Sequence, residues 1–219
     1  MICYDVYKNL NIVNDQHNPE ISSCCVMATK PESTINFYSS EYLNKIRLSW
    51  DKGEFPSECS ACKNAEENNN PSRRLGSNKW YEDNSLNNTK VELVRLDYWT
   101  GNICNLRCVI CGPDFSSAWK QEIGFPVDLK TPIINQAWRE TDLSKVRYIH
   151  FNGGEPLLSK EHVKFLQTVP NKSNVSINYN TNGAVLPSTE LLELWAQFKL
   201  VQLDFSIDDI GDRFEYQRY

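Results

Sequence analysis

The stretch Val146-Arg-Tyr-Ile-His-Phe-Asn-Gly-Gly-Glu-Pro156 places a strand-forming run directly before a glycine-rich turn. Residues 146–151 predict a strand, and residues 161–168 then carry apolar side chains at helical spacing. A strand, a turn and a helix in this order form the repeating unit of α/β proteins with parallel sheets. Residues 146–168 therefore predict an α/β fold.

Three further strands are predicted, over residues 91–98, 175–179 and 200–207, together with a second helix over 188–198. Alternating strands and helices imply right-handed crossovers and a parallel sheet. In such sheets the reactive loops lie at the carboxyl ends of the strands. The residues that directly follow each strand are therefore the candidates for function.

Three cysteines follow the first of these strands in a C-x3-C-x2-C run, namely Cys104, Cys108 and Cys111. A four-iron cluster normally takes four cysteines, so three thiolates leave one iron with an open coordination site. An open metal site is typical of chemistry rather than of a structural role. On spacing alone, a structural zinc site with a distant fourth ligand is a real alternative.

Polar turns follow the other three strands. Gly153-Gly154-Glu155 follows the second strand, where the glycines would let a ligand approach the backbone and the carboxylate would accept hydrogen bonds from an ammonium group. Asn180-Thr-Asn182-Gly183 follows the third, and Ser206-Ile-Asp208 follows the fourth, with Arg218 twelve residues beyond Ser206. Each turn alone is a weak signal, but four successive strand ends with conspicuous residues indicate a site.

These motifs resemble the radical S-adenosylmethionine (SAM) superfamily, and more narrowly its twitch-domain enzymes with an auxiliary cluster module before the barrel. The resemblance covers nearly the whole chain. Beyond the motifs above, it includes Cys24-Cys25-Val-Met-Ala, Gly53-Glu-Phe-Pro-Ser-Glu-Cys59-Ser-Ala-Cys62, Cys111-Gly-Pro-Asp-Phe-Ser-Ser and the closing Asp-Arg-Phe-Glu-Tyr-Gln-Arg-Tyr.

The resemblance implies roles for these residues. Cys104, Cys108 and Cys111 would bind a 4Fe–4S cluster whose open iron is chelated by SAM. Gly153, Gly154 and Glu155 would hold the methionyl ammonium, Ser206 and Arg218 would contact the nucleoside and carboxylate, and Asn180 and Asn182 are softer candidates for SAM contact. Reductive cleavage of SAM would give a 5′-deoxyadenosyl radical that abstracts a substrate hydrogen. The chain would then be an oxidoreductase or a transferase, with a peptide or protein as the favoured substrate and a flavodoxin or ferredoxin as electron donor.

The same resemblance implies a second, auxiliary 4Fe–4S cluster near the amino terminus. Its ligands would be Cys3, one of Cys24 and Cys25 (with Cys24 favoured), Cys59 and Cys62. A structural zinc ion also suits four thiolates and stays an alternative for this module. A helix capped by Ser39 or Ser40 and ended by Gly53 is predicted within the module, with Leu43, Ile46 and Trp50 packing.

The expected fold is a partial (β/α) radical SAM barrel with about four of the usual six parallel strands, preceded by a small cysteine-rich α+β twitch-like module. The polar segment Asn84–Thr89 reads as a linker, so the predicted domains are residues 1–85 and 86–219. Since the predicted strands number four, an open sheet edge is expected and the chain reads as truncated after strand four.

Composition excludes several function classes. The 219 residues carry 23 Lys and Arg against 28 Asp and Glu, and a net charge of −5 does not favour general nucleic-acid binding. No apolar run approaches the roughly 20 residues of a membrane helix. With no secretory signal and with oxygen-sensitive clusters, a cytoplasmic location is expected. Two non-enzymatic interpretations stay open, a truncated iron–sulfur electron carrier or binding protein and a zinc-stabilised interaction module.

Overall fold

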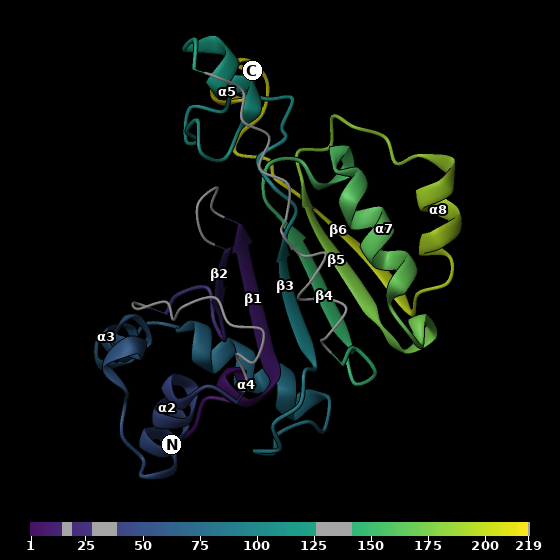
Figure 1. The fold of residues 1–219 in the computed structure, drawn as a ribbon. Helices are drawn as coiled ribbons and strands as arrows, with labels where there is room; N and C mark the ends of the chain where they lie inside the picture. The colour runs from purple at the N-terminus through teal and green to yellow at the C-terminus, as the bar shows by residue number, and fades with distance from the viewer. Residues whose placement is uncertain (15–18, 28–38, 126–141, 219) are drawn as a thin grey trace. The chain divides into compact units, whose positions relative to one another are not determined.

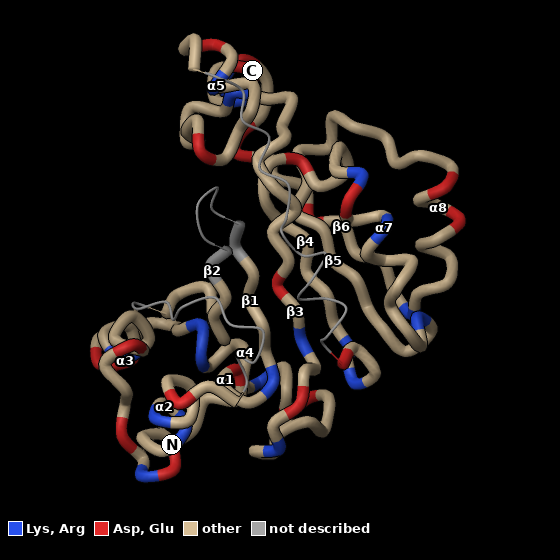
Figure 2. The backbone as a smooth tube through the Cα atoms, in the orientation of Figure 1, with Lys and Arg blue, Asp and Glu red and all other residues tan. Residues whose placement is uncertain are grey.

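The computed structural model describes residues 1–14, 19–27, 39–125 and 142–218, which form two compact units. The first unit comprises most of the residues up to Asp97, and the second comprises the residues from Tyr98 onward. The predicted domain boundary between residues 85 and 86 stays a prediction, because compactness in space does not fix where a module ends along the chain. Acidic and basic residues are interspersed along the chain in both units (Figure 2).

The first unit contains a pair of strands followed by helices (Figure 1). Its elements are α1 (Asp5–Lys8), β1 (Asn9–Asn14), β2 (Pro19–Ser22), α2 (Glu41–Asp51), the 3₁₀ turn η2 (Ser57–Cys59), α3 (Ser60–Glu67) and α4 (Arg73–Asp83). The strand order β2-β1-β3 joins this pair to the strand that was predicted to begin the barrel. The sequence did not predict this pairing of β1 with β3, and the small cysteine-rich α+β module before the barrel stays a prediction.

Helix α2 confirms its sequence signals. The side chain of Ser40 accepts a hydrogen bond from the backbone N–H of Leu43 at 3.2 Å, which caps the helix start. Gly53 follows the helix at a φ of 76°, the left-handed conformation that glycine adopts without strain. Leu43, Ile46 and Trp50 are all buried, so the helical periodicity identified the packed face correctly.

The polar segment predicted as a linker is tied to α1 by a buried lysine. The ammonium group of Lys8, which is fully buried, donates to Asn88 Oδ1 at 3.1 Å and to Lys90 O at 3.2 Å, and it pairs with Glu92 Oε1 at 3.1 Å. The backbone N–H groups of Glu92 and Val94 donate to the carbonyls of Tyr7 and Lys8. These bonds to the end of α1 explain why β3 begins at Arg95 rather than at the predicted residue 91.

The second unit contains the four predicted strands and the helices between them. Its elements are β3 (Arg95–Trp99, which begins in the first unit), α5 (Ser117–Glu122), β4 (Tyr148–Asn152), η3 (Pro156–Leu158), α7 (Lys160–Thr168), η4 (Lys172–Asn174), β5 (Ser176–Thr181), α8 (Thr189–Trp195), β6 (Leu200–Phe205) and α9 (Asp212–Gln217). The strand order is β3-β4-β5-β6. The β4–β5 and β5–β6 pairs are parallel, as predicted, with Tyr148 opposite Ser176 and Ser176 opposite Leu200.

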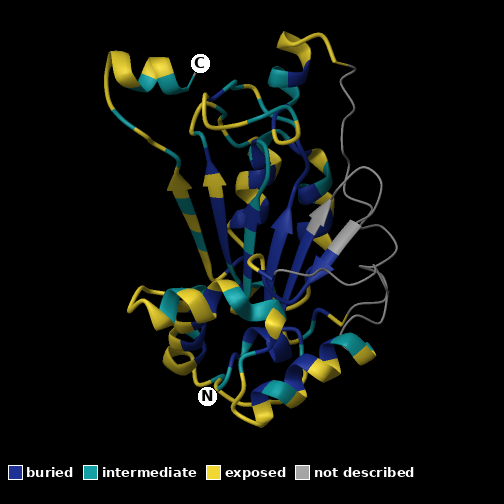
Figure 3. Cartoon of the chain, turned by 90° about the vertical axis from the view of Figure 1, so that its left-hand side faces the viewer, coloured by how far each residue is buried: buried dark blue, intermediate teal, exposed yellow. Residues whose placement is uncertain are grey.

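Helices α7 and α8 cover one face of β4, β5 and β6 (Figure 1). The core beneath them is aromatic. Phe151 stacks on Tyr179 with ring centroids 4.7 Å apart, Tyr98 stacks on Phe165 at 5.0 Å, and the indole N–H of Trp195 donates to the Tyr179 hydroxyl at 3.0 Å. By contrast, β6 is the edge strand of the described sheet and is mostly exposed or half-buried along its length (Figure 3). Within the described residues, no helix is both long enough and apolar enough to cross a membrane.

We expect the buried His162 of α7 to make this unit less stable in mild acid. Burial lowers the pKa of His162 to about 4, against about 6.5 in an unfolded chain. The unfolded chain therefore binds the extra proton between these values, and the free energy of unfolding falls by up to about 3 kcal/mol as the pH drops from about 6.5 to 4. Chemical denaturation across this range should show a shallower pH dependence in His162→Gln. An unchanged dependence in that variant would contradict the expectation.

Candidate functional site

The cysteine loop, Cys104–Cys111, lies between β3 and α5 and is tied to the start of that helix. The backbone N–H of Cys104 donates to Ser117 Oγ at 3.1 Å, and the Ser116 hydroxyl donates to Leu106 O at 2.7 Å. Ser116 is also the N-cap of α5, and the indole N–H of Trp119 donates to Cys108 O at 2.9 Å. One helix terminus therefore fixes the path of the loop on both sides of its second cysteine.

The three thiols of the loop gather at one place. Burial is the main cause that raises the pKa of all three thiols. Negative charge on another cysteine of the group raises the pKa of each thiol further. Cys108 is buried, Cys104 is partly exposed and Cys111 is exposed, and none forms a disulfide. A buried free thiol with a raised pKa that interacts electrostatically with two others is suited to a positive metal centre, which would keep all three ionised.

The Gly153-Gly154 turn packs directly on the chain that leads into the cysteine loop. A Cβ atom on Gly153, whose φ is 127°, would lie 2.6 Å from Gly101 O, and one on Gly154 would lie 2.3 Å from Ile103 O. The backbone N–H groups of Gly154 and Glu155 donate to these same carbonyls at 2.8 and 2.7 Å. Glycine is therefore required at both positions because two backbone segments pack closely here. This requirement is separate from the ligand approach expected from sequence.

Glu155 joins the ends of β4 and β5. Its side chain is 1% exposed, and the carboxylate accepts hydrogen bonds from the Thr181 hydroxyl at 2.9 Å, from Asn182 N at 2.8 Å and from Leu157 N at 3.1 Å. Two of these bonds go to Oε1, so Oε2 retains acceptor capacity. Glu155 was identified as a candidate from the sequence, but Thr181 was not identified as its partner. The only sequence signal for Thr181 was its place in the Thr-Asn-Gly motif.

The two asparagines predicted as candidates for SAM contact, Asn180 and Asn182, lie in different surroundings. The side-chain amide of Asn182 donates to Asn105 Oδ1 at 2.9 Å and lies 3.9 Å from Cys104 Sγ, so it belongs to the cysteine loop. Asn180 is exposed on β5, directly opposite Asp204 of β6 in the strand register. Asn182 therefore contacts the cysteine loop. Asn180 lies two residues earlier, within β5.

Arg218 returns to the cysteine loop from the far end of α9. Its guanidinium pairs with Asp208 Oδ2 at 2.6 Å and lies 3.9 Å from Cys108 Sγ. The backbone N–H of Val109 donates to Gln217 O at 2.9 Å, which docks this end of α9 on the loop. Ser206 lies at the end of β6, where its N–H donates to Thr181 O at 2.8 Å. The carboxyl ends of β4, β5 and β6 thus converge on the cysteines, as the parallel-sheet rule predicted.

A separate cavity lies within the first unit, and four cysteines line it. The cavity encloses about 340 Å³, part of it open to solvent, and we call it the cysteine cavity. The cysteines on its wall are Cys3, Cys24, Cys59 and Cys62. Burial is the largest cause that raises the pKa of Cys3, and negative charge on Asp5, Cys59 and Cys62 contributes, as expected for thiols that line one cavity. Cys25 is exposed and does not line the cavity, whereas its neighbour Cys24 is buried and does.

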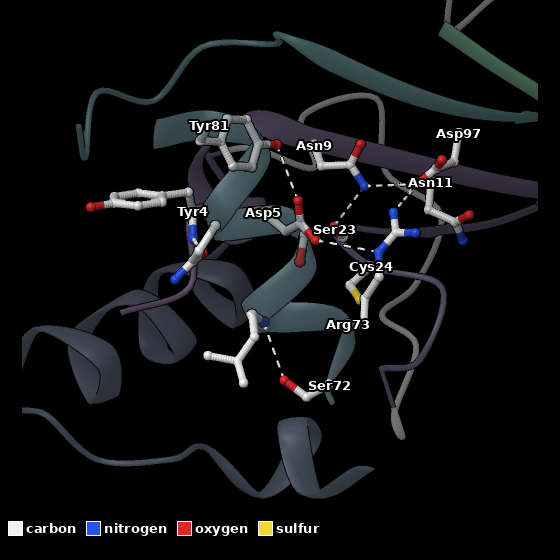
Figure 4. Close-up of polar contacts among 12 residues, drawn as sticks. Tyr4, Asp5, Asn9, Asn11, Ser23, Cys24, Ser72, Arg73, Tyr81 and Asp97 are labelled. Atoms are coloured by element: carbon white, nitrogen blue, oxygen red, sulfur yellow. Dashed lines mark hydrogen bonds and ion pairs between the residues drawn. The ribbon is translucent and has the colours of Figure 1, made fainter. Parts of the chain in front are cut away.

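A buried polar network lies behind Cys24 and fixes its position (Figure 4). The side-chain amide of Asn9 donates to the carbonyl of Ser23 and to Asp97 Oδ2, both at 3.1 Å. Arg73 pairs with Asp97 at 2.9 Å and approaches the fully buried Asp5 at 3.8 Å. The Ser22 hydroxyl donates to Cys24 O at 2.9 Å. These bonds hold the peptide on both sides of Cys24 without using its sulfur.

The wall of the cysteine cavity also carries Trp50, which is buried. Among the described residues, its indole nitrogen has no hydrogen-bond partner of normal geometry, yet it lowers the pKa of the nearby Cys59 thiol, which burial raises to about 12 overall. A buried indole N–H costs free energy unless it finds an acceptor. Thiolate and inorganic sulfide are acceptors that a cluster would place here, so the cavity fits such a group.

Within the described ranges, no group of three or more His, Cys, Asp or Glu side chains is arranged around a single metal ion. The ligands of a four-iron cluster each bind a different iron atom, so they stand farther apart than the ligands of one ion. The donor sets described above are three and four thiols, which is the chemistry that such clusters use.

Comparison with known proteins assigns the second unit. A family model described as the radical SAM superfamily matches residues 99–219. The GTP 3′,8-cyclases of Actinobacillus pleuropneumoniae serotype 3 and Haemophilus ducreyi are 26% and 27% identical over 113 and 114 residues, covering 51% of this chain and 32% of each relative. The protein YfkA of Bacillus subtilis is 28% identical over 96 residues, covering 42% of this chain and 24% of its own length.

The chain therefore aligns with about a third or less of the length of these curated relatives. No solved structure matches the chain.

Proposed function

This chain belongs to the radical SAM superfamily, and from that premise we propose that it binds SAM at a 4Fe–4S cluster held by Cys104, Cys108 and Cys111. Such a centre, when reduced, supplies a 5′-deoxyadenosyl radical that abstracts a hydrogen atom from a substrate. The observation that carries the proposal is the convergence of three free thiols with the ends of β4, β5 and β6 at one place.

The chain's own residues would hold and orient the two cofactors. Asn182 and Arg218 place donor groups near the sulfurs of Cys104 and Cys108, where they stabilise negative charge on the ligands. Glu155 keeps acceptor capacity on Oε2 for the methionyl ammonium, beside the backbone of Gly153 and Gly154. Arg218 also offers a cation to the methionyl carboxylate, and Ser206 offers a hydroxyl to the nucleoside.

We also propose an auxiliary 4Fe–4S cluster in the cysteine cavity, with Cys3, Cys24, Cys59 and Cys62 as its ligands. The four cysteines line one cavity together with an indole N–H that needs an acceptor, and both features support this proposal. Four thiolates would also bind zinc, so the metal content of the protein decides between the two.

Substrate and partners are proposed from the sequence resemblance alone. A peptide or protein substrate and a flavodoxin or ferredoxin as electron donor are the favoured assignments, and oxygen-sensitive clusters favour a cytoplasmic location. The GTP 3′,8-cyclases align with about half of this chain, so the alignment supports the shared core and not their substrate.

Anaerobic purification followed by iron, sulfide and zinc analysis tests the proposal first. Two clusters correspond to roughly eight iron atoms per chain. Adding SAM and a chemical reductant to this protein should then yield 5′-deoxyadenosine. Iron-replete protein that yields none would favour the electron-carrier interpretation, and zinc in place of iron would favour the interaction module.

The adjacent cysteines give a matched pair of variants for the auxiliary site. We expect Cys24→Ala to lower the iron content from roughly eight to roughly four atoms per chain, because Cys24 lines the cysteine cavity. Cys25→Ala should leave both clusters in place, since Cys25 is exposed and outside that wall. Iron analysis of the two purified variants checks this, and the opposite pattern would transfer the ligand role to Cys25.

A further inference from the structure

The peptide bonds on both sides of Cys3 are held by one asparagine of α4. The side-chain amide of Asn78 donates to the carbonyl of Ile2 at 2.8 Å, and its Oδ1 accepts from the backbone N–H of Tyr4 at 3.0 Å. Asn78 is buried, and both of its bonds are partly shielded from water. Cys3 stands between the two bonded groups and lines the cysteine cavity.

Arg74 adds a second donor on the same face of α4, one turn before Asn78. Its guanidinium donates to the Ile2 carbonyl at 2.8 Å, so two side chains hold one carbonyl oxygen. Residues four apart lie side by side on a helix surface, which is why both reach the same acceptor. Arg74 itself lines the cysteine cavity.

Arg74 is in turn held rigidly from α3. Glu66 forms a two-bond pair with the Arg74 guanidinium, and the hydroxyl of Ser72, the N-cap of α4, also donates to Glu66 at 2.6 Å. The guanidinium lies over the rings of Trp50 and Phe55, 5.8 and 5.5 Å from their centroids. A bidentate pair combined with aromatic contacts fixes an arginine in one orientation.

This arrangement matters because Cys3 lies in residues 1–3, which form neither a helix nor a strand. A segment without regular structure loses backbone conformational entropy when a ligand draws it in, roughly 1–2 kcal/mol for each residue that becomes ordered. The bonds from Asn78 and Arg74 order residues 2–4 before any ligand binds. These bonds do not use the Cys3 sulfur, and Cys3 lines the cysteine cavity together with Cys59 and Cys62.

We propose that Asn78, supported by Arg74, is a positioning residue that presents Cys3 to the cysteine cavity as the fourth ligand of the auxiliary cluster. The inference rests on the proposed auxiliary cluster and adds the residues that make the amino-terminal cysteine a competent ligand. Partners outside the ligand shell that orient ligands of a metal typically change metal affinity 10- to 100-fold.

The test measures how fast a chelator removes the auxiliary cluster from anaerobically purified full-length protein. Asn78→Ala removes both bonds, and we expect the auxiliary cluster to be lost at least about tenfold faster. Its electron paramagnetic resonance signal should change as it does in Cys3→Ser. Asn78→Asp keeps the acceptor for Tyr4 but not the donor for Ile2, and it should give an intermediate rate. The exposed neighbour Lys79, changed to alanine, is the control and should behave as wild type.

A double variant separates positioning from a general loss of stability. If Asn78 acts through Cys3, then Asn78→Ala should change neither the rate nor the signal further when Cys3→Ser is already present. Wild-type loss rate and signal in Asn78→Ala, or an equal acceleration in the Cys3→Ser background, would overturn the inference. If the wild-type protein holds only roughly four iron atoms per chain, the proposed auxiliary cluster is contradicted. The inference about Asn78 then fails with it.

Discussion

Replacing Cys108 by alanine is expected to abolish SAM cleavage and to remove roughly four of roughly eight iron atoms per chain. Cys108 is the buried member of the cysteine loop, with Cys104 and Cys111 on either side in sequence and Arg218 3.9 Å from its sulfur. Two thiolates cannot hold a cluster that already has one open iron. Loss of an outer partner alone costs about 10- to 100-fold, so loss of this ligand should lower 5′-deoxyadenosine formation more than about 100-fold.

The control for this variant is Cys25→Ala, which makes the same chemical change at an exposed position outside both sets of proposed ligands. Product formation is followed by chromatography after SAM and reductant are added to anaerobically purified protein. Full iron content together with wild-type product formation in Cys108→Ala would contradict the proposed cluster at the cysteine loop.

Gly154→Ala should lower the free energy of unfolding of the second unit by about 3 kcal/mol and should also impair SAM binding. The added Cβ would lie 2.3 Å from the backbone oxygen of Ile103, which cannot move aside as a flexible side chain would. Any shift of the turn also breaks the bond from the Glu155 N–H to that same oxygen. The buried Glu155 carboxylate would then lose its alignment with Thr181 and Asn182.

Gly112→Ala is the matched control in the same unit, because nothing lies within 4 Å of a Cβ at that position. Chemical denaturation of both variants measures the difference in stability. An alanine at residue 154 that leaves the unfolding midpoint within the error of wild type would show that the turn can relax, and would contradict the packing role assigned to this glycine.

The sequence predicted much of the sheet because the underlying signals are local. The strands β4, β5 and β6 and the helices between them were identified from periodicity within single segments, with shifts of a few residues at their ends. Strand β3 was predicted too long, since residues 92 and 94 bond to the end of α1, a partner more than 80 positions away in sequence. The joining of β1 and β2 to this sheet was missed for the same reason, because strand pairing is a long-range choice.

For the candidate site, too, short motifs could be recognised in the sequence but contacts between distant residues could not. The cysteine spacing and the turn motifs were visible as short patterns, and the structure brings Cys104, Asn182, Glu155 and Arg218 to one place. The sequence did not reveal that Glu155 binds Thr181 and Asn182, or that Arg218 pairs with Asp208. The residue pattern alone left the choice between Cys24 and Cys25 open, and only the family resemblance favoured Cys24.

The fold class and the candidate ligands could be predicted from the sequence alone, since apolar periodicity and thiol spacing are properties of short segments. The contacts between distant segments could be read only from the folded chain: the four cysteines of one cavity, the asparagine that holds Cys3, and the close backbone contact at Gly154. The physical reason is that hydrogen bonds and close packing act over a few ångströms. The partners they join can be 75 or more residues apart in the chain, as Ile2 and Asn78 are.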